Sequence, residues 1–145
     1  MIITKECFDK ITTTNIDSNV EFGGILGRNG SGVILKEFYD KGIRFTDMPL
    51  CCYYPDVDKL NEVIKKWSEE GIEFCGIYHT HYSDIASFSE YDMDYMRKIL
   101  NAMPDDRKSL YFPLLLFPNA IFKSFVVTLS SDGELIVTAD NIKVI

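Results

Sequence analysis

The sequence lacks any apolar run close to the roughly 20 residues that a helix needs to cross a bilayer. Its first ten residues, MIITKECFDK, carry four charged side chains, so they also lack the uninterrupted apolar segment of a secretory signal. Apolar residues nevertheless make up 46% of the 145 positions, enough for a sizeable core. We therefore expect one soluble domain over residues 1–145 and a cytoplasmic location.

Paired cysteines are absent as well. The four cysteines form no CxxC motif, and a chain of this length does not need disulfides to stabilise its core. We expect reduced thiols at Cys7, Cys51, Cys52 and Cys75. A cysteine peptidase built on Cys51 or Cys52 is a weak alternative, because the sequence places no base beside either thiol.

An excess of basic charge is also lacking. The formal net charge is -7, whereas binding to a phosphate backbone requires a basic face. Nucleic acid and membrane are therefore not expected partners. Basic proteins or basic peptide segments are the more natural ones, although a net charge does not describe a local patch.

Turn signals and apolar periodicity predict both strands and helices. The expected elements are a hairpin over about 22–39, a helix from Asp56 or Asp58 to Gly71, a strand over Glu73–His81, a helix over 89–103, and strands over 110–117, 121–129 and 134–139. The run Thr13-Thr14-Asn15 favours a helix only weakly before the hairpin. This order predicts a mixed α/β (α+β) sandwich with helices packed on a sheet.

Histidine is scarce, and both histidines lie at the end of one expected strand, as His79-Thr80-His81. Residues two apart on a strand project to one face, about 6.5–7 Å apart at Cα. Two such imidazoles can converge on one ion, or they can simply be polar residues at a loop. Counting back along the same face reaches Ile77 and Cys75, and we expect Cys75 to be a small buried residue, too deep to be a third ligand.

The helix that follows begins with Ser89-Glu90-Tyr91-Asp92, which has the form of a capping box. In such a box the serine oxygen accepts from the third helical N–H, and the acid accepts from the serine N–H. Capping alone would explain both residues. Asp92 also stands where the chain first returns toward the strand end, so it is a candidate third ligand beside the histidines.

Three protein ligands leave a fourth zinc position for water, which is typical of a catalytic site. Such a site needs a base, and Glu21 is a single acid at the edge of the apolar, glycine-rich segment VEFGGILG. Burial there would raise its pKa toward useful values. The alternative is a solvated residue before a strand. Gly23 and Gly24 indicate a close backbone approach or a bulge.

Glu21 with FGGILG, then His79-x-His81, seven residues, Ser89, two residues and Asp92, resembles the JAMM signature of the JAB1/MPN/Mov34 metalloprotease family, especially its small bacterial members. The resemblance implies a cytidine-deaminase-like MPN fold, a mixed β-sheet flanked by helices. It also implies a zinc isopeptidase or peptidase that cleaves the bond after the C-terminus of a ubiquitin-like or sulfur-carrier-like protein, with activating or conjugating enzymes of that pathway as further partners.

By the same resemblance, His79, His81 and Asp92 are the ligands of one Zn²⁺ with a bound water. Glu21 is then the general acid/base, and Ser89 steadies the oxyanion. Three features depart from the family pattern: Tyr82 replaces the proline that usually follows the second histidine, the helix before Glu21 is weakly supported, and no long substrate-recognition insertion is present. Tyr82 implies either a less rigid loop or an aromatic at the cleft mouth.

Two other function classes compete with the zinc peptidase. One is a catalytically silent MPN module that binds or scaffolds partners, although such modules generally lack one or more of the ligands. The other is a metal-dependent hydrolase or deaminase of a small molecule. The related deaminase signature, H-x-E with P-C-x-x-C, is absent from the sequence.

Overall fold

A computed structural model of the chain describes residues 1–14, 20–47 and 52–145. The helices of this part are α1 (Lys5–Thr13), α2 (Val57–Glu69) and α3 (Glu90–Ala102). The strands are β1 (Ile2–Ile3), β2 (Gly23–Arg28), β3 (Val33–Asp40), β4 (Glu73–His81), β5 (Ser109–Tyr111), β6 (Leu114–Leu116), β7 (Ile121–Leu129), β8 (Leu135–Asp140) and β9 (Lys143–Val144). None of these helices has the length and apolarity needed to cross a membrane.

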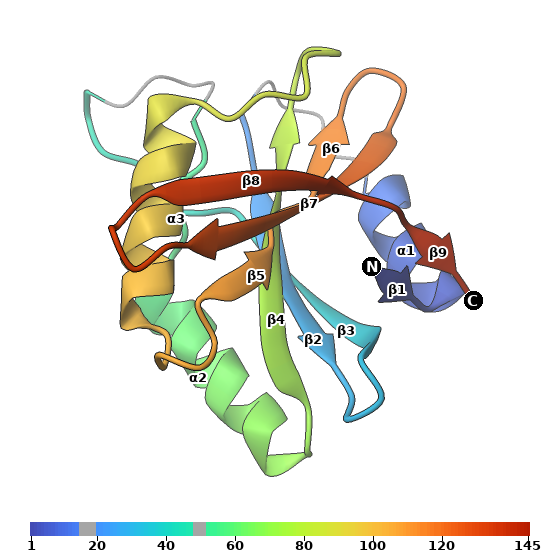
Figure 1. Cartoon of the computed structure of the whole chain (residues 1–145). Helices are drawn as coiled ribbons and strands as arrows, with labels where there is room; N and C mark the ends of the chain where they lie inside the picture. Colours follow the sequence, from blue (N-terminus) through green and yellow to red (C-terminus); the bar gives the residue numbers. More distant parts are fainter. Residues whose placement is uncertain (15–19, 48–51) are drawn as a thin grey trace.

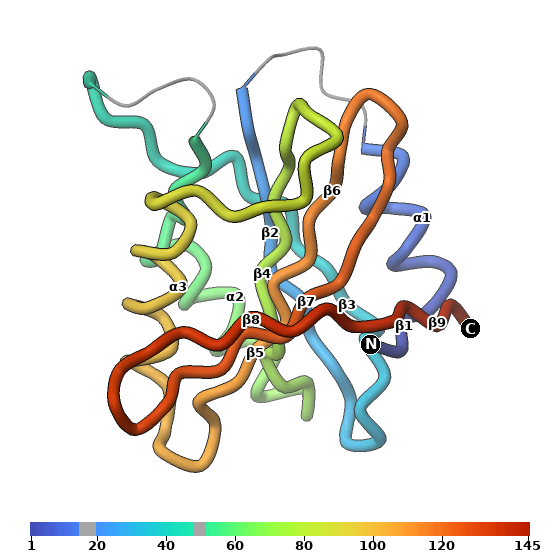
Figure 2. The backbone as a smooth tube through the Cα atoms, turned by 45° about the horizontal axis from the view of Figure 1, so that its top comes forward, coloured from blue at the N-terminus to red at the C-terminus, as the bar shows by residue number. Residues whose placement is uncertain are grey.

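The strands form one mixed sheet in which β4 has neighbours on both sides. The order is β5-β7-β6-β4-β2-β3-β1-β9, with β8 paired to β7. β2 pairs antiparallel with β3 and β4, whereas β4 pairs in parallel with β5 and β6. The two ends of the chain lie side by side, because β1 pairs in parallel with β9 (Figure 2).

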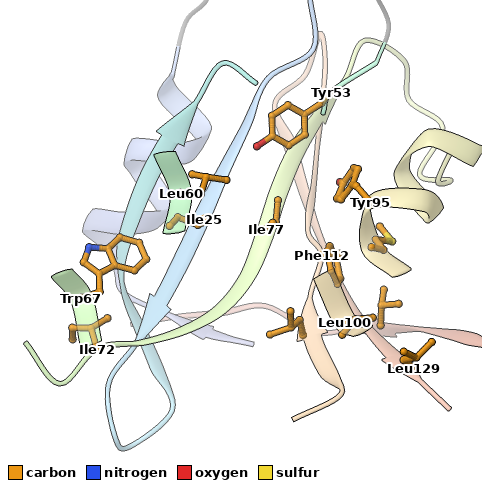
Figure 3. Close-up of a cluster of buried hydrophobic side chains, with 13 residues drawn as sticks. Ile25, Tyr53, Leu60, Trp67, Ile72, Ile77, Tyr95, Leu100, Phe112 and Leu129 are labelled. Atoms are coloured by element: carbon orange, nitrogen blue, oxygen red, sulfur yellow. The ribbon is translucent and has the colours of Figure 1, made fainter. Parts of the chain in front are cut away.

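Helices cover both faces of the sheet, with α2 and α3 on one face and α1 on the other (Figure 1). Two apolar clusters fill the layers between them. The larger cluster packs α2 and α3 against β2 and β4, as Figure 3 shows with Leu60 and Trp67 from α2 and Ile25 and Ile77 from the strands. The smaller cluster packs α1 against the opposite face. The predicted sandwich of helices on a sheet is confirmed.

Local signals account for most element boundaries. Asp56 caps α2 by accepting from the N–H of Lys59 at 3.3 Å, and the helix gives way to Gly71, whose φ of 74° favours glycine. The hairpin, the strands β4 and β7 and the helix α3 also agree with the sequence prediction.

Two predictions need correction. A helix, α1, does precede the hairpin, because Thr4 caps it and Lys5 pairs with Asp9 one turn along; it ends at Thr13, where the weak threonine run begins. The strand expected over 110–117 is two short strands, β5 and β6, interrupted before Leu114. Pro113 has no N–H to donate to a sheet, so continuous pairing stops there.

Candidate metal centre

The two histidines lie at the carboxyl end of β4 with their side chains on one face, as the sequence predicts. His79 and His81 are both buried, and their Nε2 atoms lie 2.9 Å apart. β2 lies on one side of this strand end and β6 on the other, where His79 is opposite Leu114. Two imidazole nitrogens that face one buried point could supply two of the four ligands of a tetrahedral metal site.

The start of α3 brings Asp92 to the same point. Asp92 is 1% exposed, and its Oδ1 lies 3.2 Å from His79 Nε2 while its Oδ2 lies 3.3 Å from His81 Nε2. The capping box is also present: Ser89 N–H donates to Asp92 Oδ2 at 2.7 Å, and Asp92 N–H donates to Ser89 Oγ at 3.2 Å. Capping and convergence on the histidines therefore occur together, because the cap orients the carboxylate.

Glu21 reaches the histidines from the segment that leads into β2. Both backbone polar groups of Phe22 are bound to Thr80, since Phe22 N–H donates to Thr80 Oγ1 at 2.9 Å and Thr80 N–H donates to the Phe22 carbonyl at 2.9 Å. These two hydrogen bonds hold Glu21 beside the strand end, where it is 7% exposed. Donor atoms of Glu21, His79 and His81 all lie within 4.8 Å of one another.

The glycines after Glu21 permit this close approach. A Cβ on Gly23 would lie 2.4 Å from the Tyr78 carbonyl oxygen and 2.6 Å from the ring of Tyr53. A Cβ on Gly24 would lie 2.3 Å from the Phe38 carbonyl oxygen. Real Cβ contacts do not occur at such distances, so only glycine lets β2 pass between these groups. The close backbone approach predicted from the sequence is confirmed.

The pKa values of the two acids in this cluster are shifted in opposite directions. Burial raises the pKa of Glu21 to about 8, despite an opposing effect from the charge of His81. Burial also acts to raise the pKa of Asp92, but its contacts with His79 and His81 hold it well below its usual range. Asp92 is thus an ionised carboxylate near neutral pH, whereas Glu21 can exchange a proton there.

The histidines also differ in their environment. Burial lowers the pKa of His79, which is 0% exposed and therefore neutral. Burial acts in the same direction on His81, but the hydrogen bond with Asp92 and the charge of Glu21 raise its pKa overall. Nδ1 of His81 faces the Ile85 carbonyl oxygen at 3.4 Å, and Nδ1 of His79 faces Tyr95 Oη at 2.9 Å. Both rings are thus held from behind, as metal-binding histidines usually are.

These residues fit a divalent cation such as Zn²⁺. Glu21, His79 and His81 form a buried group of three donors that could hold a metal ion, and Asp92 contacts both histidines. Asp92 Oδ1 is buried without a hydrogen-bond partner, although His79 Nε2 is only 3.2 Å away. An uncompensated carboxylate oxygen is costly in a protein interior, and a cation among these donors would compensate it. Imidazole and carboxylate are the ligands that zinc uses.

Tyr82, which replaces the usual proline of the family, is fixed against its surroundings. Its ring stacks on Phe117 with centroids 5.4 Å apart, and its hydroxyl donates to the Val20 carbonyl oxygen at 3.2 Å. Val20 immediately precedes Glu21, so Tyr82 ties the loop after β4 to the segment that carries this acid. Its side chain is 37% exposed, which leaves an aromatic surface beside the cluster.

The position assigned to Cys75 needs correction. The register between β2 and β4 shifts between Leu26 and Gly27, so Cys75 does not follow the alternation that leads to His79. It packs in the smaller cluster, on the other face of the sheet from Ile77, and donates to the Leu26 carbonyl oxygen at 3.4 Å. As expected it is buried and not near the histidines, and burial raises the pKa of its thiol to about 12. Cys52 is also buried, and Cys51 lies outside the described residues.

Three further residues at the cluster were missed by the sequence analysis. Tyr95 contacts His79 from α3, and the ring of Tyr53 stacks on His79 with centroids 6.0 Å apart and planes 16° apart. The hydroxyl of Tyr53 donates to the buried carboxylate of Asp40 at 2.8 Å. Tyr95 follows Asp92 by three positions, a spacing that puts both on one helix face, so this signal was available. For Tyr53 and Asp40 the sequence holds no such signal.

Comparison with known proteins agrees with this fold. A solution structure of protein DSY2949 from Desulfitobacterium hafniense superposes with a TM-score of 0.66 and 20% identity, covering 99% of this chain and 92% of that one. A crystal structure of a JAB1/MPN domain protein from Archaeoglobus fulgidus superposes with a TM-score of 0.52 and 15% identity, covering 100% and 97%. At such identities the likeness shows the fold alone.

No curated protein matches the sequence. A family described as prokaryotic homologs of the JAB domain does match, over residues 12–132, which include Glu21, both histidines, Ser89 and Asp92. The match spans most of the 145 residues, and the structural likeness to a JAB1/MPN domain agrees with it. The chain therefore belongs to the family of prokaryotic homologues of the JAB domain.

Proposed function

We propose that this chain is a zinc-dependent isopeptidase or peptidase that cleaves the bond after the C-terminus of a ubiquitin-like or sulfur-carrier-like protein. The observation that carries the proposal is the pairing of two buried acids beside the histidines. Asp92 is held ionised, and burial raises the pKa of Glu21 to about 8. A carboxylate ligand of a metal must be ionised at neutral pH, whereas a general base must be able to take up and release a proton there.

In this proposal His79, His81 and Asp92 hold one Zn²⁺. When bound, the ion would lower the pKa of a water molecule to about 7 and polarise the scissile carbonyl. Glu21 accepts a proton from water and returns it to the leaving nitrogen, a role that suits a carboxyl with a pKa near the working pH. The amine thus leaves as a neutral group, and Glu21 returns to its starting state because it gives up the proton that it took from water.

Ser89 is assigned to the carbonyl oxygen on which negative charge develops. Its Oγ accepts from the N–H of Asp92, which leaves the hydroxyl hydrogen available as a donor. Ser89 is exposed, so its hydroxyl is within reach of a substrate. The helix cap fixes the position of this donor before substrate binds, and such preorganisation is the source of most oxyanion stabilisation.

The substrate is assigned from the family resemblance and is part of the proposal. A non-catalytic scaffold is the weaker alternative, because all five residues of the signature are present and four of them converge in one buried cluster. A gene for a ubiquitin-like protein beside the gene for this chain, with activating or conjugating enzymes, would name the partner and the pathway.

The proposal is tested with the purified full chain and a ubiquitin-like protein that carries a reporter peptide at its C-terminus. We expect about one zinc per chain in a site that chelators can empty. Glu21→Gln should retain the zinc and lose roughly 100- to 10,000-fold in turnover, because only the base is removed.

Glu37→Gln is the matched control. Burial also raises the pKa of Glu37, on β3, but this carboxyl is not part of the cluster, so turnover should match the wild type. Absence of bound divalent metal in the wild type would overturn the zinc assignment. Unchanged turnover in Glu21→Gln would overturn the assignment of the base.

A further inference from the structure

His79 is enclosed by two tyrosines that come from different elements. Tyr95 lies on α3 and Tyr53 lies in the segment before α2, and Figure 3 shows the two side chains approaching the region of β4 from separate directions. Tyr53 is 0% exposed and Tyr95 is 2% exposed, so the histidine has no solvent behind it. Tyr95 also makes a polar contact with the histidine, because its Oη lies 2.9 Å from His79 Nδ1.

This contact bears on which nitrogen of His79 carries the proton. A neutral imidazole has one N–H donor and one lone pair. Nε2 faces His81 and Asp92, so it must keep the lone pair to bind a cation there. The proton then belongs on Nδ1, where a fully buried N–H needs an acceptor. A phenol oxygen can accept that hydrogen bond.

For His81 the corresponding acceptor is a backbone carbonyl group. Its Nδ1 faces the Ile85 carbonyl oxygen at 3.4 Å, and a carbonyl can only accept, so the proton is set on Nδ1. No side-chain substitution can remove this acceptor. For His79 the corresponding partner is a side chain, and it can be removed as a single oxygen atom by Tyr95→Phe.

We propose that Tyr95 is a positioning residue that sets the tautomer of His79: Tyr95 Oη accepts the hydrogen bond from Nδ1–H and so keeps the lone pair on Nε2. This inference rests on the proposed zinc site. Without the hydroxyl, the buried Nδ1–H would have no acceptor in the tautomer that binds metal, and the other tautomer would compete. Loss of an outer-shell partner of this kind typically weakens metal binding about 10- to 100-fold.

Tyr78→Phe is the matched control. Tyr78 is the neighbour of His79 on β4 and is 0% exposed, but it packs in the smaller cluster on the other face of the sheet. Both substitutions remove one oxygen from a fully buried tyrosine. Only Tyr95→Phe removes the hydrogen-bond partner of a proposed zinc ligand.

The test measures zinc affinity by competition with a chromophoric chelator, together with the unfolding of each metal-free protein. Tyr95→Phe should bind zinc about 10- to 100-fold more weakly, and Tyr78→Phe should stay within about threefold of the wild type. The ¹⁵N NMR spectrum of the zinc-loaded wild type should show His79 protonated at Nδ1. In Tyr95→Phe this proton should exchange faster with solvent.

Equal zinc affinities of Tyr95→Phe and the wild type would overturn the inference and leave the proposed zinc function in place. An equal loss in both tyrosine variants would also overturn it, because it would indicate a general packing effect. Failure of the wild type to bind zinc would overturn both proposals. If Tyr95→Phe did not fold, the wild-type spectrum would decide, since a proton on Nε2 of His79 contradicts the assigned tautomer.

Discussion

Glu21 and Asp92 show how environment divides two similar side chains between two roles. Both carboxyls are buried near the same histidines, and burial acts to raise the pKa of each. Only Asp92 faces both imidazoles and accepts from the Ser89 N–H, and these contacts stabilise its charge. For Glu21, burial outweighs the charge of His81 and the hydrogen bond from the Tyr53 backbone, so its pKa rises to about 8. The role of each acid follows from its hydrogen-bond donors.

The first prediction concerns Glu21 in the metal-free protein. Its carboxyl keeps its proton to about pH 8 when the chain is folded but loses it near 4.5 when unfolded. Between these two values the folded chain holds a proton that the unfolded chain has lost. The free energy of unfolding of the wild type therefore falls as the pH rises through this window. Glu21→Gln cannot ionise, so its free energy of unfolding should rise relative to the wild type between about pH 5 and 8, by at most about 1.4 kcal/mol per unit. Denaturant unfolding at several pH values measures this difference, and a difference independent of pH would contradict it.

A second prediction at the residue scale concerns Gly23. Gly23→Ala would place a methyl group 2.6 Å from the ring of Tyr53, the ring that stacks on His79. We expect a loss of roughly 1 to 3 kcal/mol in the free energy of unfolding and weaker zinc binding, since the ring must move. Gly30→Ala, in the hairpin turn with nothing within 4 Å of the added carbon, should change stability by less than about 0.5 kcal/mol. Similar effects of the two substitutions would show that the close approach is unimportant.

At the scale of elements, the parts that signal themselves locally were predictable. The Ser89 capping box and the apolar strand Glu73–His81 each contain their own start and stop signals, and both elements agree with the structure. The weak points were segments whose structure depends on distant contacts. Strand β1 has two residues and exists because it pairs with β3 and β9, and the bulge that turns Cys75 to the other face depends on the register with β2.

The residues of the candidate site also fall into those that the sequence could predict and those that it could not. Residue types and spacing made Glu21, His79, His81 and Asp92 candidates for one site, the family resemblance assigned all four to it, and the structure brings them together. The tyrosines behind His79 were not predicted, because Tyr53 lies in a segment without regular structure and its approach depends on the space left by a glycine. Contacts across the fold of this kind have no periodic signature in the chain.

The third prediction separates the two roles assigned to the first turn of α3. Ser89→Ala removes a helix cap and a proposed oxyanion donor, so it should lower the free energy of unfolding by about 1 kcal/mol and turnover by roughly 100- to 1000-fold. Asp56→Ala removes the cap of α2 and should cost a similar amount of stability with turnover unchanged. Stability and cleavage assays on both variants measure this contrast. Equal turnover in the two would limit Ser89 to capping.

At the scale of the whole molecule, the candidate centre joins parts that are distant in the sequence. Glu21 comes from the segment before β2, the histidines from the end of β4, and Asp92 from the start of α3. Two acids are buried among these elements, and the Asp92 oxygen Oδ1 has no hydrogen-bond partner. A cation among them would compensate this charge and connect the three elements, so metal binding should contribute to the stability of the fold.

The last prediction measures this contribution. Zinc that binds only the folded chain should raise the free energy of unfolding by about 2.7 kcal/mol when free zinc is 100 times its dissociation constant, and a chelator should reverse the gain. Thermal or denaturant unfolding with and without zinc measures it. Asp92→Asn should lose most of the gain, because the proposed ligand loses its charge, whereas Glu21→Gln should keep it, because the proposed base is not needed to hold the ion. If Glu21→Gln lost the gain and Asp92→Asn kept it, the ligand would be Glu21, and the roles of the two acids would have to be exchanged.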